Sequence, residues 1–428
     1  MPEGGHLPRR RVTAGAGTGD RIVVVGASLA GLRAAEELRA AGFDGTITVV
    51  GDEPHRPYDR PPLSKQVLAG DWGLDRIALT VACEGGLDAL DLDWRTGTRA
   101  VGLDVAARRV TLAGGESLAY DGLVVATGAA PRTLPGTAGL GGVHTLRTLD
   151  DCLAVRADLD AGAHRVVVVG AGFIGSEVAA TCRDRGCDVT ILEALPVPLG
   201  RALGDEMGAV MGGLHRDHGV DLRLGTGVDR MEGGDRVERV RLADGSAIPA
   251  DLVVVGIGVS PNTGWLAGSG LTVDDGVVCD ATTLAAPGVV AAGDVARWPS
   301  RRFGELMRVE HWDNAIAMGE HAARRLLAEI GVADGAGGGA PLVYDPVPWF
   351  WSDQYDRKVQ LAGRSSGADE VRVVDGSTGE RRFAALYRRG DRLAGVLAMN
   401  RPRLVVTYRA LVERGATWDE ALALAASA

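Results

Sequence analysis

The stretch CRDRGC holds two cysteines, Cys182 and Cys187, with four residues between them, a spacing at which a redox-active disulfide can form. The surrounding pattern places Cys182 late in a helix and Cys187 in the turn after it. Residues five apart on a helix lie about 140° apart around its axis, so the two thiols would not share a face. We interpret Cys182 as a small core residue. The other cysteines have no partner at a metal or redox spacing and are also interpreted as structural: Cys83, Cys152 and Cys279.

Glycine turns offer a second kind of chemistry, the binding of phosphates. Residues 21–53 read as a β-branched run, a glycine turn, a helical pattern and a second β-branched run. Gly26, Ser28 and Gly31 occupy the three positions of a GxGxxG fingerprint, in which helix N-terminal amides face a pyrophosphate. Ser28 departs from the usual second glycine, but that position needs only a small residue. Asp52 follows about 20 residues later, as a ribose ligand should.

The same pattern recurs in residues 165–194, where Gly170, Gly172 and Gly175 match the fingerprint in full and Glu193 ends the second strand. A carboxylate about 4 Å from a 2′-phosphate would cost about 4 kcal/mol at an effective dielectric constant of 20. The residues directly after Glu193 are alanine and leucine, so no adjacent arginine compensates for that repulsion. The second unit therefore favours NAD over NADP.

Two further segments, 120–132 and 283–297, are predicted strands that end in the residues ATG and GD. Both resemble motifs of the two-dinucleotide flavoprotein superfamily, in which the first glycine unit binds FAD. The resemblance implies an α/β fold with two Rossmann-like domains, the FAD domain interrupted by the NAD domain, plus a C-terminal α+β domain. The parts implied are a disordered tail at 1–19, an FAD-binding domain at 20–129 and 259–330, an NAD-binding domain at 130–258, a linker at 331–340 and a C-terminal domain at 341–428.

The length of the chain indicates that it folds as several domains, because 428 residues exceed what one hydrophobic core usually supports. The formal net charge of −10 disfavours nucleic acid as a partner. Apolar runs fall well short of the roughly 18 to 20 residues that a membrane span needs. The first 19 residues lack the apolar stretch of a signal peptide. We therefore expect a cytoplasmic protein without a membrane partner.

Five motifs in order then narrow the family: GDEPHRPYDRPPLSK, LRTLDD, AAGDVARW, VEHWDNAIAMGEHAA and VPWFWSDQYDRKVQLAG. They resemble those of the NADH-dependent ferredoxin reductases that serve Rieske dioxygenases and bacterial cytochromes P450. In the disulfide reductases of the superfamily, redox cysteines follow the first glycine unit, whereas residues 56–70 here contain none. The resemblance implies hydride transfer from NADH to FAD and one-electron delivery to a [2Fe-2S] or other small ferredoxin, by a monomer or weak homodimer.

The motifs and the resemblance together assign cofactor contacts. The residues assigned to FAD are Gly26, Ser28, Ala30, Gly31, Asp52, Arg60, Lys65, Ala100, Thr127, Gly128, Arg147, Gly293, Asp294 and Trp312. The residues assigned to NAD are Gly170, Gly172, Phe173, Ile174, Gly175, Glu193, Arg201, Gly258 and Glu310.

Lys65 and Glu177 resemble the family's catalytic ion pair at the flavin N5. A lysine there would stabilise the negative charge of the reduced ring, and a carboxylate would fix the lysine. The alternative is an ordinary lysine after a proline turn and a helical glutamate facing solvent. Trp312 could shorten an electron path to the surface, and 349–351 is interpreted as a packed aromatic cluster of the last domain.

The last domain is predicted as a small antiparallel sheet followed by helices, from alternating runs such as KVQLAG and RLAGVLAMN. The stretch 297–308 adds four arginines, either as a docking patch for an acidic ferredoxin or as a solvated loop. His215 and His218 lack a third ligand, so we interpret both as surface histidines and expect no metal.

Two other functions remain as alternatives for the same fold. One is an NADH oxidase or a reductase of quinones or other small acceptors. The other is an NADH-sensing flavoprotein that resembles apoptosis-inducing factors. The near-complete site motifs weigh against the sensing flavoprotein.

Overall fold

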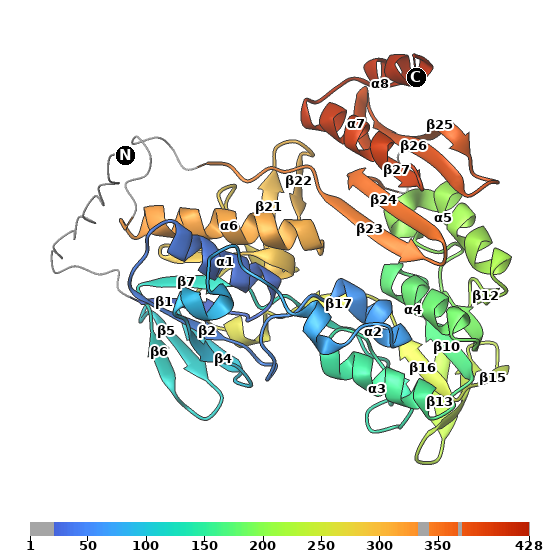
Figure 1. Cartoon of the computed structure of the whole chain (residues 1–428), viewed down its shortest axis with the longest axis horizontal. Helices are drawn as coiled ribbons and strands as arrows, with labels where there is room; N and C mark the ends of the chain where they lie inside the picture. The colour runs from blue at the N-terminus through green and yellow to red at the C-terminus, as the bar shows by residue number, and fades with distance from the viewer. Residues whose placement is uncertain (1–20, 333–341, 367–369, 428) are drawn as a thin grey trace, which may run out of the picture.

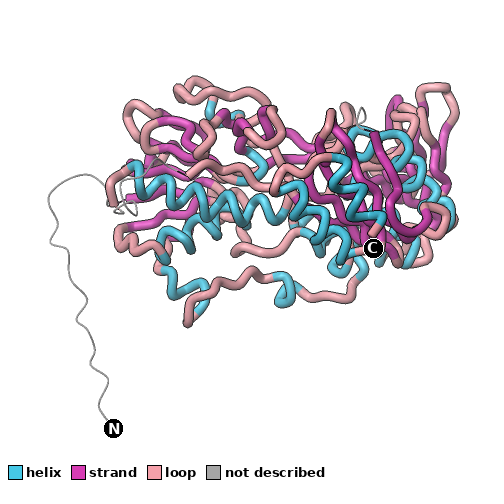
Figure 2. The backbone as a smooth tube through the Cα atoms, turned by 90° about the horizontal axis from the view of Figure 1, so that it is seen from above, coloured by secondary structure: helices cyan, strands magenta, loops and turns pink. Residues whose placement is uncertain are grey.

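The computed structural model describes residues 21–332, 342–366 and 370–427. The predicted tail at 1–19 and most of the predicted linker at 331–340 lie outside the described residues. Figure 1 shows three parts: a first sheet whose N-terminal strands are blue to teal, a second sheet in green and yellow, and the C-terminal sheet in orange and red. Seen from above, the strands form separate groups flanked by helices (Figure 2).

The first sheet brings together the two ends of the predicted FAD domain. Its strand order is β19-β20-β7-β1-β2-β3, and within the described strands of this sheet β19 pairs antiparallel with β20 while the other pairs are parallel. The strands are β1 (Arg21–Val25), β2 (Thr46–Val50), β3 (Asp93–Arg95), β7 (Gly122–Val125), β19 (Leu284–Ala286) and β20 (Val289–Ala291). Helices α1 (Leu29–Ala40) and α6 (Trp312–Glu329) pack against each other. The fold therefore places a late segment of the chain beside the first glycine turn.

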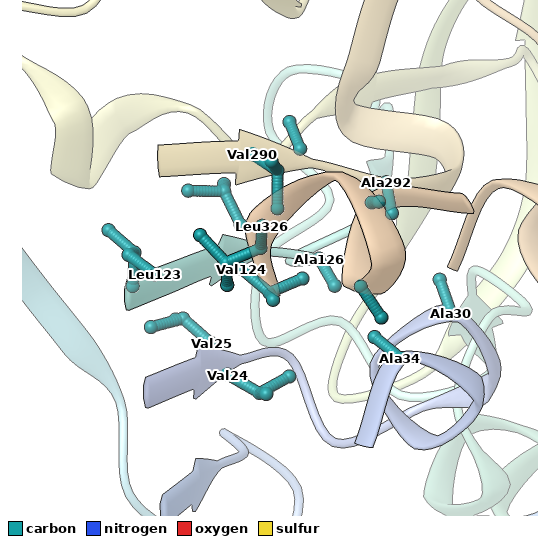
Figure 3. Close-up of a cluster of buried hydrophobic side chains, with 14 of the residues drawn as sticks. Val24, Val25, Ala30, Ala34, Leu123, Val124, Ala126, Val290, Ala292 and Leu326 are labelled. Atoms are coloured by element: carbon teal, nitrogen blue, oxygen red, sulfur yellow. The ribbon is translucent and has the colours of Figure 1, made fainter. Parts of the chain in front are cut away.

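A continuous apolar core holds this part together. Figure 3 shows Val24 of β1, Val124 of β7 and Val290 of β20 beside Ala34 of α1 and Leu326 of α6. All five side chains are fully buried. Parallel strands buried on both faces read as continuous runs of β-branched residues, as RIVVV does. Each fully buried side chain of this size contributes roughly 1.5 to 3 kcal/mol.

The second sheet repeats the arrangement with parallel strands in the order β12-β11-β10-β16-β9. These strands are β9 (Val143–His144), β10 (Arg165–Val169), β11 (Asp188–Leu192), β12 (Asp221–Arg223) and β16 (Leu252–Val255). Its helices are α3 (Leu149–Asp160), α4 (Phe173–Asp184) and α5 (Gly200–Asp217). The same two parts also contain small three-stranded sheets. Their strands are β4 (Ala100–Asp104), β5 (Arg109–Leu112), β6 (Ser117–Ala119), β13 (Val228–Gly233), β14 (Val237–Leu242), β15 (Ala247–Pro249), β18 (Val277–Val278), β21 (Ala296–Ser300) and β22 (Glu305–Met307).

The predicted boundaries between the two dinucleotide domains fall in a pair of short crossing strands. β8 (Ala129–Pro131) pairs antiparallel with β17 (Val259–Pro261), and Val259 lies opposite Pro131. The chain therefore leaves the first part through β8 and returns to it through β17, and these two strands lie side by side. The domain boundaries themselves stay a prediction, whereas the predicted α/β fold class is confirmed.

The C-terminal part is an antiparallel sheet with strand order β23-β24-β27-β26-β25, as predicted. Its elements are β23 (Trp349–Gln354), β24 (Arg357–Gly363), β25 (Glu370–Ser377), β26 (Arg382–Arg389), β27 (Arg392–Met399), α7 (Pro402–Glu413) and α8 (Trp418–Ala426). One core joins this sheet to α7 and α8. A second core joins it to α5, with Phe383 packed near Met207 and Met211. The sheet is therefore fixed to the second dinucleotide part.

The prediction that His215 lies on the surface is wrong. Its side chain on α5 is fully buried, with Nδ1 2.9 Å from the Tyr355 hydroxyl and Nε2 3.1 Å from Ser176 Oγ. Burial lowers the pKa of His215 to about 4. His218 does lie nearer the surface and stacks on the Tyr355 ring. Helical spacing alone did not reveal that the C-terminal sheet covers this turn of α5.

We predict an acid-sensitive stability due to His215. The unfolded histidine takes up its proton near pH 6.5 and the folded one near 4, so the unfolded state binds more protons between these values. Stability must therefore fall as pH is lowered through this window, by about 2 kcal/mol at pH 5 relative to pH 7. Thermal unfolding of His215→Gln measured at both pH values should show a smaller loss than the wild type. The same comparison with His218→Gln should match the wild type, and an unchanged pH dependence in His215→Gln would contradict the assignment.

Candidate functional site

A cavity of about 590 Å³ lies where the two parallel sheets and β23 meet. Most of the residues assigned from the sequence line it. From the FAD set these are Ser28, Ala30, Arg60, Lys65, Gly128, Arg147, Gly293, Asp294 and Trp312. From the NAD set these are Gly172, Phe173, Ile174, Gly175, Gly258 and Glu310, together with Glu177.

The first glycine turn lies between β1 and α1. Gly26 has φ 123°, and a Cβ on it would lie 2.0 Å from the Ala126 carbonyl oxygen, so only glycine fits. Ser28 Oγ accepts a hydrogen bond from Arg60 Nε at 3.3 Å. The first turn of α1 consists of uncharged residues, Leu29 to Leu32. The turn thus leaves helix amides available to an anion.

The second glycine turn lies between β10 and α4 and has the same geometry. Gly170 has φ 99°, and a Cβ on it would lie 2.4 Å from the Gly256 carbonyl oxygen. At Gly172 the nearest atom to such a Cβ is 3.8 Å away, so the glycine leaves open space through which a ligand can approach the backbone. The first turn of α4 is also uncharged. Both turns fit the pyrophosphate of a dinucleotide.

Glu193 lies at the carboxyl end of β11, beside the second glycine turn. Its Oε2 accepts from the Ala171 amide and its Oε1 from the Leu195 amide, both at 2.8 Å. These two hydrogen bonds hold the carboxylate beside the second glycine turn. Its role in choosing NAD remains a prediction.

The remaining assigned residues lie outside the lining of the cavity. Asp52 is exposed and forms an ion pair with Arg99 at 2.6 Å. Arg201 is exposed near the start of α5, and Ala100 is buried at the start of β4. The others outside the lining are Gly26, Gly31, Thr127, Gly170 and Glu193. Their cofactor contacts, like all of the assigned contacts, stay predictions.

The segment that carries Lys65 belongs to the first part in sequence and packs on the second part in space. Leu63, Val67 and Leu68 share a buried core with α3 and α4. Two further contacts fix the backbone, because Cys152 Sγ lies 3.1 Å from the Leu63 carbonyl and Thr181 Oγ1 donates to the Ser64 carbonyl at 2.8 Å. These contacts direct the lysine toward α4.

Lys65 and Glu177 form the predicted ion pair, with 2.8 Å between Nζ and Oε2. The lysine side chain is 12% exposed and the glutamate side chain 4%. Ser64 Oγ donates to the same carboxylate oxygen at 2.5 Å, and Ser352 Oγ donates to Oε1 at 2.7 Å. Glu177 therefore does not face solvent. A buried carboxylate needs such donors, since burying an unpaired charge is strongly unfavourable.

A chain of polar contacts follows the cavity on the FAD side. Arg60 Nη2 donates to Glu53 Oε1 at 2.6 Å and Arg60 Nη1 to the Arg147 carbonyl at 2.7 Å. Arg147 Nη2 in turn donates to Asp294 Oδ2 at 2.7 Å. Asp294 follows β20 in the short helix Gly293–Val295. These contacts hold the predicted FAD residues Arg60, Arg147 and Asp294 together.

Aromatic side chains close the cavity on the C-terminal side. Trp312 Nε1 donates to Asp59 Oδ1 at 2.7 Å, and burial raises the pKa of Asp59. Trp351 packs edge-on against Trp312 with ring centroids 5.9 Å apart. Phe350 packs against Phe173 at 4.4 Å. Within 349–351 only Trp349 and Trp351 pack on each other, so the predicted single cluster of the last domain is not formed. Phe350 and Trp351 also line the cavity, which the sequence analysis did not predict.

Sequence reasoning missed several other residues of the site. Ser64, Asp59 and His311 all lie within quoted motifs, yet only the fold turns them toward the cavity. Burial lowers the pKa of His311 to about 4, and its Nδ1 has no hydrogen-bond partner among the described residues. Ser352 was missed because it lies 175 positions from Glu177 in the chain.

None of the cysteines is among the described residues that line the cavity. Cys182 is fully buried in α4, and burial raises its pKa to about 12. Cys187 is also buried, and all five cysteines are free thiols. A thiol with a pKa as high as that of Cys182 is a poor nucleophile. Within the described ranges, no cluster of metal-ligating side chains was found.

Two of the four arginines in the stretch 297–308 form ion pairs with neighbouring carboxylates. Arg297 pairs with Asp274, and Arg308 pairs with Asp275 and Glu310. Arg302 donates to the carbonyl of Val412 near the end of α7. These pairs favour the solvated loop over the docking patch.

The comparison with known proteins decides the family. A model described as pyridine nucleotide-disulphide oxidoreductase matches residues 20–319. The chain belongs to this family. A second model, described as reductase C-terminal, matches residues 349–428. This oxidoreductase therefore combines the two dinucleotide-binding sheets with a distinct C-terminal part, and the predicted cofactors, FAD and NAD(H), are those of the family.

Individual relatives of this oxidoreductase agree. Rhodocoxin reductase of Rhodococcus erythropolis is 42% identical over 386 residues, which are 89% of this chain and 87% of that protein. The ferredoxin–NAD(+) reductase component of the anthranilate 1,2-dioxygenase system of Burkholderia cepacia is 38% identical, covering 94% of this chain and 96% of that protein. The covalent putidaredoxin reductase–putidaredoxin complex superposes with a TM-score of 0.85 at 35% identity, covering 92% of this chain and 93% of that one.

Among the described helices of this oxidoreductase, none combines the length and apolar character required to cross a membrane.

The buried thiols generate the first prediction for the site. Replacing both Cys182 and Cys187 with alanine should leave the rate of NADH oxidation within about twofold of the wild type, because neither thiol lines the cavity. Steady-state turnover with a one-electron acceptor measures this. Loss of most of the activity with a normal flavin content would show that the thiols take part.

The position of Glu193 beside the second glycine turn generates the second prediction for the site. Glu193→Gln should reduce the preference for NADH over NADPH by at least about tenfold, because the charge that repels a 2′-phosphate is removed, while the remaining side-chain oxygen can still accept one of the two backbone amide hydrogen bonds. The ratio of kcat/KM for the two nucleotides measures the change. An unchanged ratio would place the ribose elsewhere.

Proposed function

We propose that this chain is an FAD-dependent NADH:ferredoxin reductase that serves a cytochrome P450 or a Rieske oxygenase. The observation that carries the proposal is the buried Lys65–Glu177 pair at the junction of the two dinucleotide sheets, in a cavity that has no cysteine among its described lining residues. The names of the relatives, which include reductases of both kinds of oxygenase system, support it. The proposal includes a cytoplasmic location, which suits five unpaired thiols.

The two glycine turns account for cofactor placement. The turn at Gly26 and the contacts of Arg147 and Asp294 would hold FAD, and the turn at Gly172 with Glu193 would hold NADH. Bound FAD supplies two-electron uptake from the nicotinamide and one-electron release. The protein contributes orientation, because two rigid sheets fix the relative position of the two nucleotides.

Lys65 contributes the charge at the reacting ring. An ammonium group beside the flavin stabilises the negative charge that accumulates on reduction. Glu177 keeps that ammonium in place and balances it while the flavin is oxidised. Around the pair, Phe350, Trp351 and Trp312 limit the access of water, which strengthens the electrostatic interactions inside.

Anaerobic mixing with NADH tests the proposal. The purified yellow protein should bleach rapidly, and steady-state turnover should be much faster with a small [2Fe-2S] ferredoxin than with oxygen or a quinone. Preferred turnover with oxygen or quinone would instead identify an oxidase or a quinone reductase. Slow bleaching with a long-lived charge-transfer band would identify an NADH-sensing flavoprotein.

The ion pair gives a sharper prediction. Lys65→Met should lower the rate of flavin reduction by NADH by about 100-fold, because a charge aimed at a developing negative charge is typically worth that much. Lys358→Met is the matched control, since Lys358 is 46% exposed and pairs with Asp353 on the surface. Rapid-mixing absorbance at the flavin band measures both. Equal rates in Lys65→Met and the wild type would remove Lys65 from the mechanism.

A further inference from the structure

The C-terminal sheet contributes a side chain to the ion pair of the dinucleotide parts. Ser352 lies on β23 and is fully buried. Its hydroxyl donates to Glu177 Oε1 at 2.7 Å, whereas Lys65 and Ser64 occupy Oε2. Ser352 is thus the donor that satisfies the second oxygen of the carboxylate.

The neighbouring Gln354 fixes the direction of this hydrogen bond. Gln354 is also fully buried and donates from Nε2 to Ser352 Oγ at 3.2 Å. Since Ser352 Oγ accepts from Gln354, its own proton is directed to the acidic Glu177. Residues two apart on a strand share a face, so Phe350, Ser352 and Gln354 point the same way. Because burying polar groups is costly, two buried polar side chains on such a face are expected only where they serve a structural or functional role.

We propose that Ser352 is a positioning residue of the electron-transfer site. By holding Glu177 Oε1, it fixes the rotation of the carboxylate and, through Oε2, the place of the Lys65 ammonium. The C-terminal sheet is then part of the machinery that reduces the flavin. This inference rests on the proposed function for the role of Lys65, but the contact it invokes can be tested without turnover.

Without the Ser352 hydroxyl, Glu177 Oε1 would lack a donor among the described residues. The carboxylate would then rotate to share its remaining donors, and Lys65 would move with it. A hydrogen bond to a charged group is strong enough for its loss to change an equilibrium by about tenfold or more. The effect should appear in the placement of Lys65 rather than in the binding of NADH, because Ser352 does not line the cavity.

The sequence makes the placement of Lys65 directly observable. Lys65 and Lys358 are the only lysines in the chain. Lysine labelled with ¹³C and ¹⁵N therefore gives two side-chain signals in the FAD-loaded protein. In Ser352→Ala the Lys65 signal should shift or broaden, while that of Lys358 stays in place. Ser176→Ala is the matched control, since Ser176 is also fully buried and adjoins Glu177 but bonds to His215.

Kinetics and potentials then connect the contact to function. Ser352→Ala should lower the limiting rate of flavin reduction about tenfold with the affinity for NADH within about twofold. It should also make the flavin midpoint potential more negative, and Ser352→Thr should restore the rate. In a Glu177→Gln background, adding Ser352→Ala should change little, because residues acting through one another are not additive.

The outcomes separate this inference from the proposed function. If the wild type bleaches with NADH but Ser352→Ala matches it in rate, potential and Lys65 signal, the positioning role is wrong and the proposed function stands. Additive losses in Ser352→Ala and Glu177→Gln would also overturn the role. If the wild type does not bleach, the proposed function fails, and the lysine spectra still decide whether Ser352 places Lys65.

Discussion

The candidate site depends on one buried carboxylate. Glu177, on the helix of the second dinucleotide unit, accepts hydrogen bonds from Lys65 and Ser64 of the first unit and from Ser352 of the C-terminal sheet. An ionised carboxylate that is 4% exposed is tolerated only while its donors are in place. The three parts of the chain must therefore pack together for the site to exist, and the separate apolar cores that join them serve this requirement.

The presence of lysine rather than arginine at position 65 agrees with this arrangement of the site. Of the 46 basic residues in the chain only two are lysine, so arginine carries almost every other positive charge. Arginine suits the planar, fork-like contacts that Arg60 and Arg147 make along the cavity. A compact ammonium on a flexible stem suits a position where a charge must lie close to a ring and be held by one carboxylate. The residue types thus agree with the geometry.

Much of this could be predicted from the sequence. The two glycine turns, their flanking strands and the antiparallel C-terminal sheet follow from local patterns, because Gly26 and Gly170 need a positive φ and β-branched runs form buried strands. What could not be predicted depends on packing between distant segments. His215 was predicted on the surface, because its helix alone does not show that the C-terminal sheet covers α5. Ser352 has no local feature that distinguishes it from any other polar residue of a strand. The aromatic residues were predicted as a core, but no local pattern shows that a core borders a cavity.

Electrons on this account pass from nicotinamide to flavin to an external acceptor, and no thiol takes part. Cys182 and Cys187 are buried, neither lines the cavity, and burial raises the pKa of Cys182 to about 12. The most direct measurement is an anaerobic reductive titration of the FAD-loaded protein that counts the electrons taken up per flavin. The account predicts uptake of two electrons, with the flavin absorbance lost in proportion throughout. Uptake of four electrons, two of them without bleaching, would reveal a redox-active disulfide and contradict it.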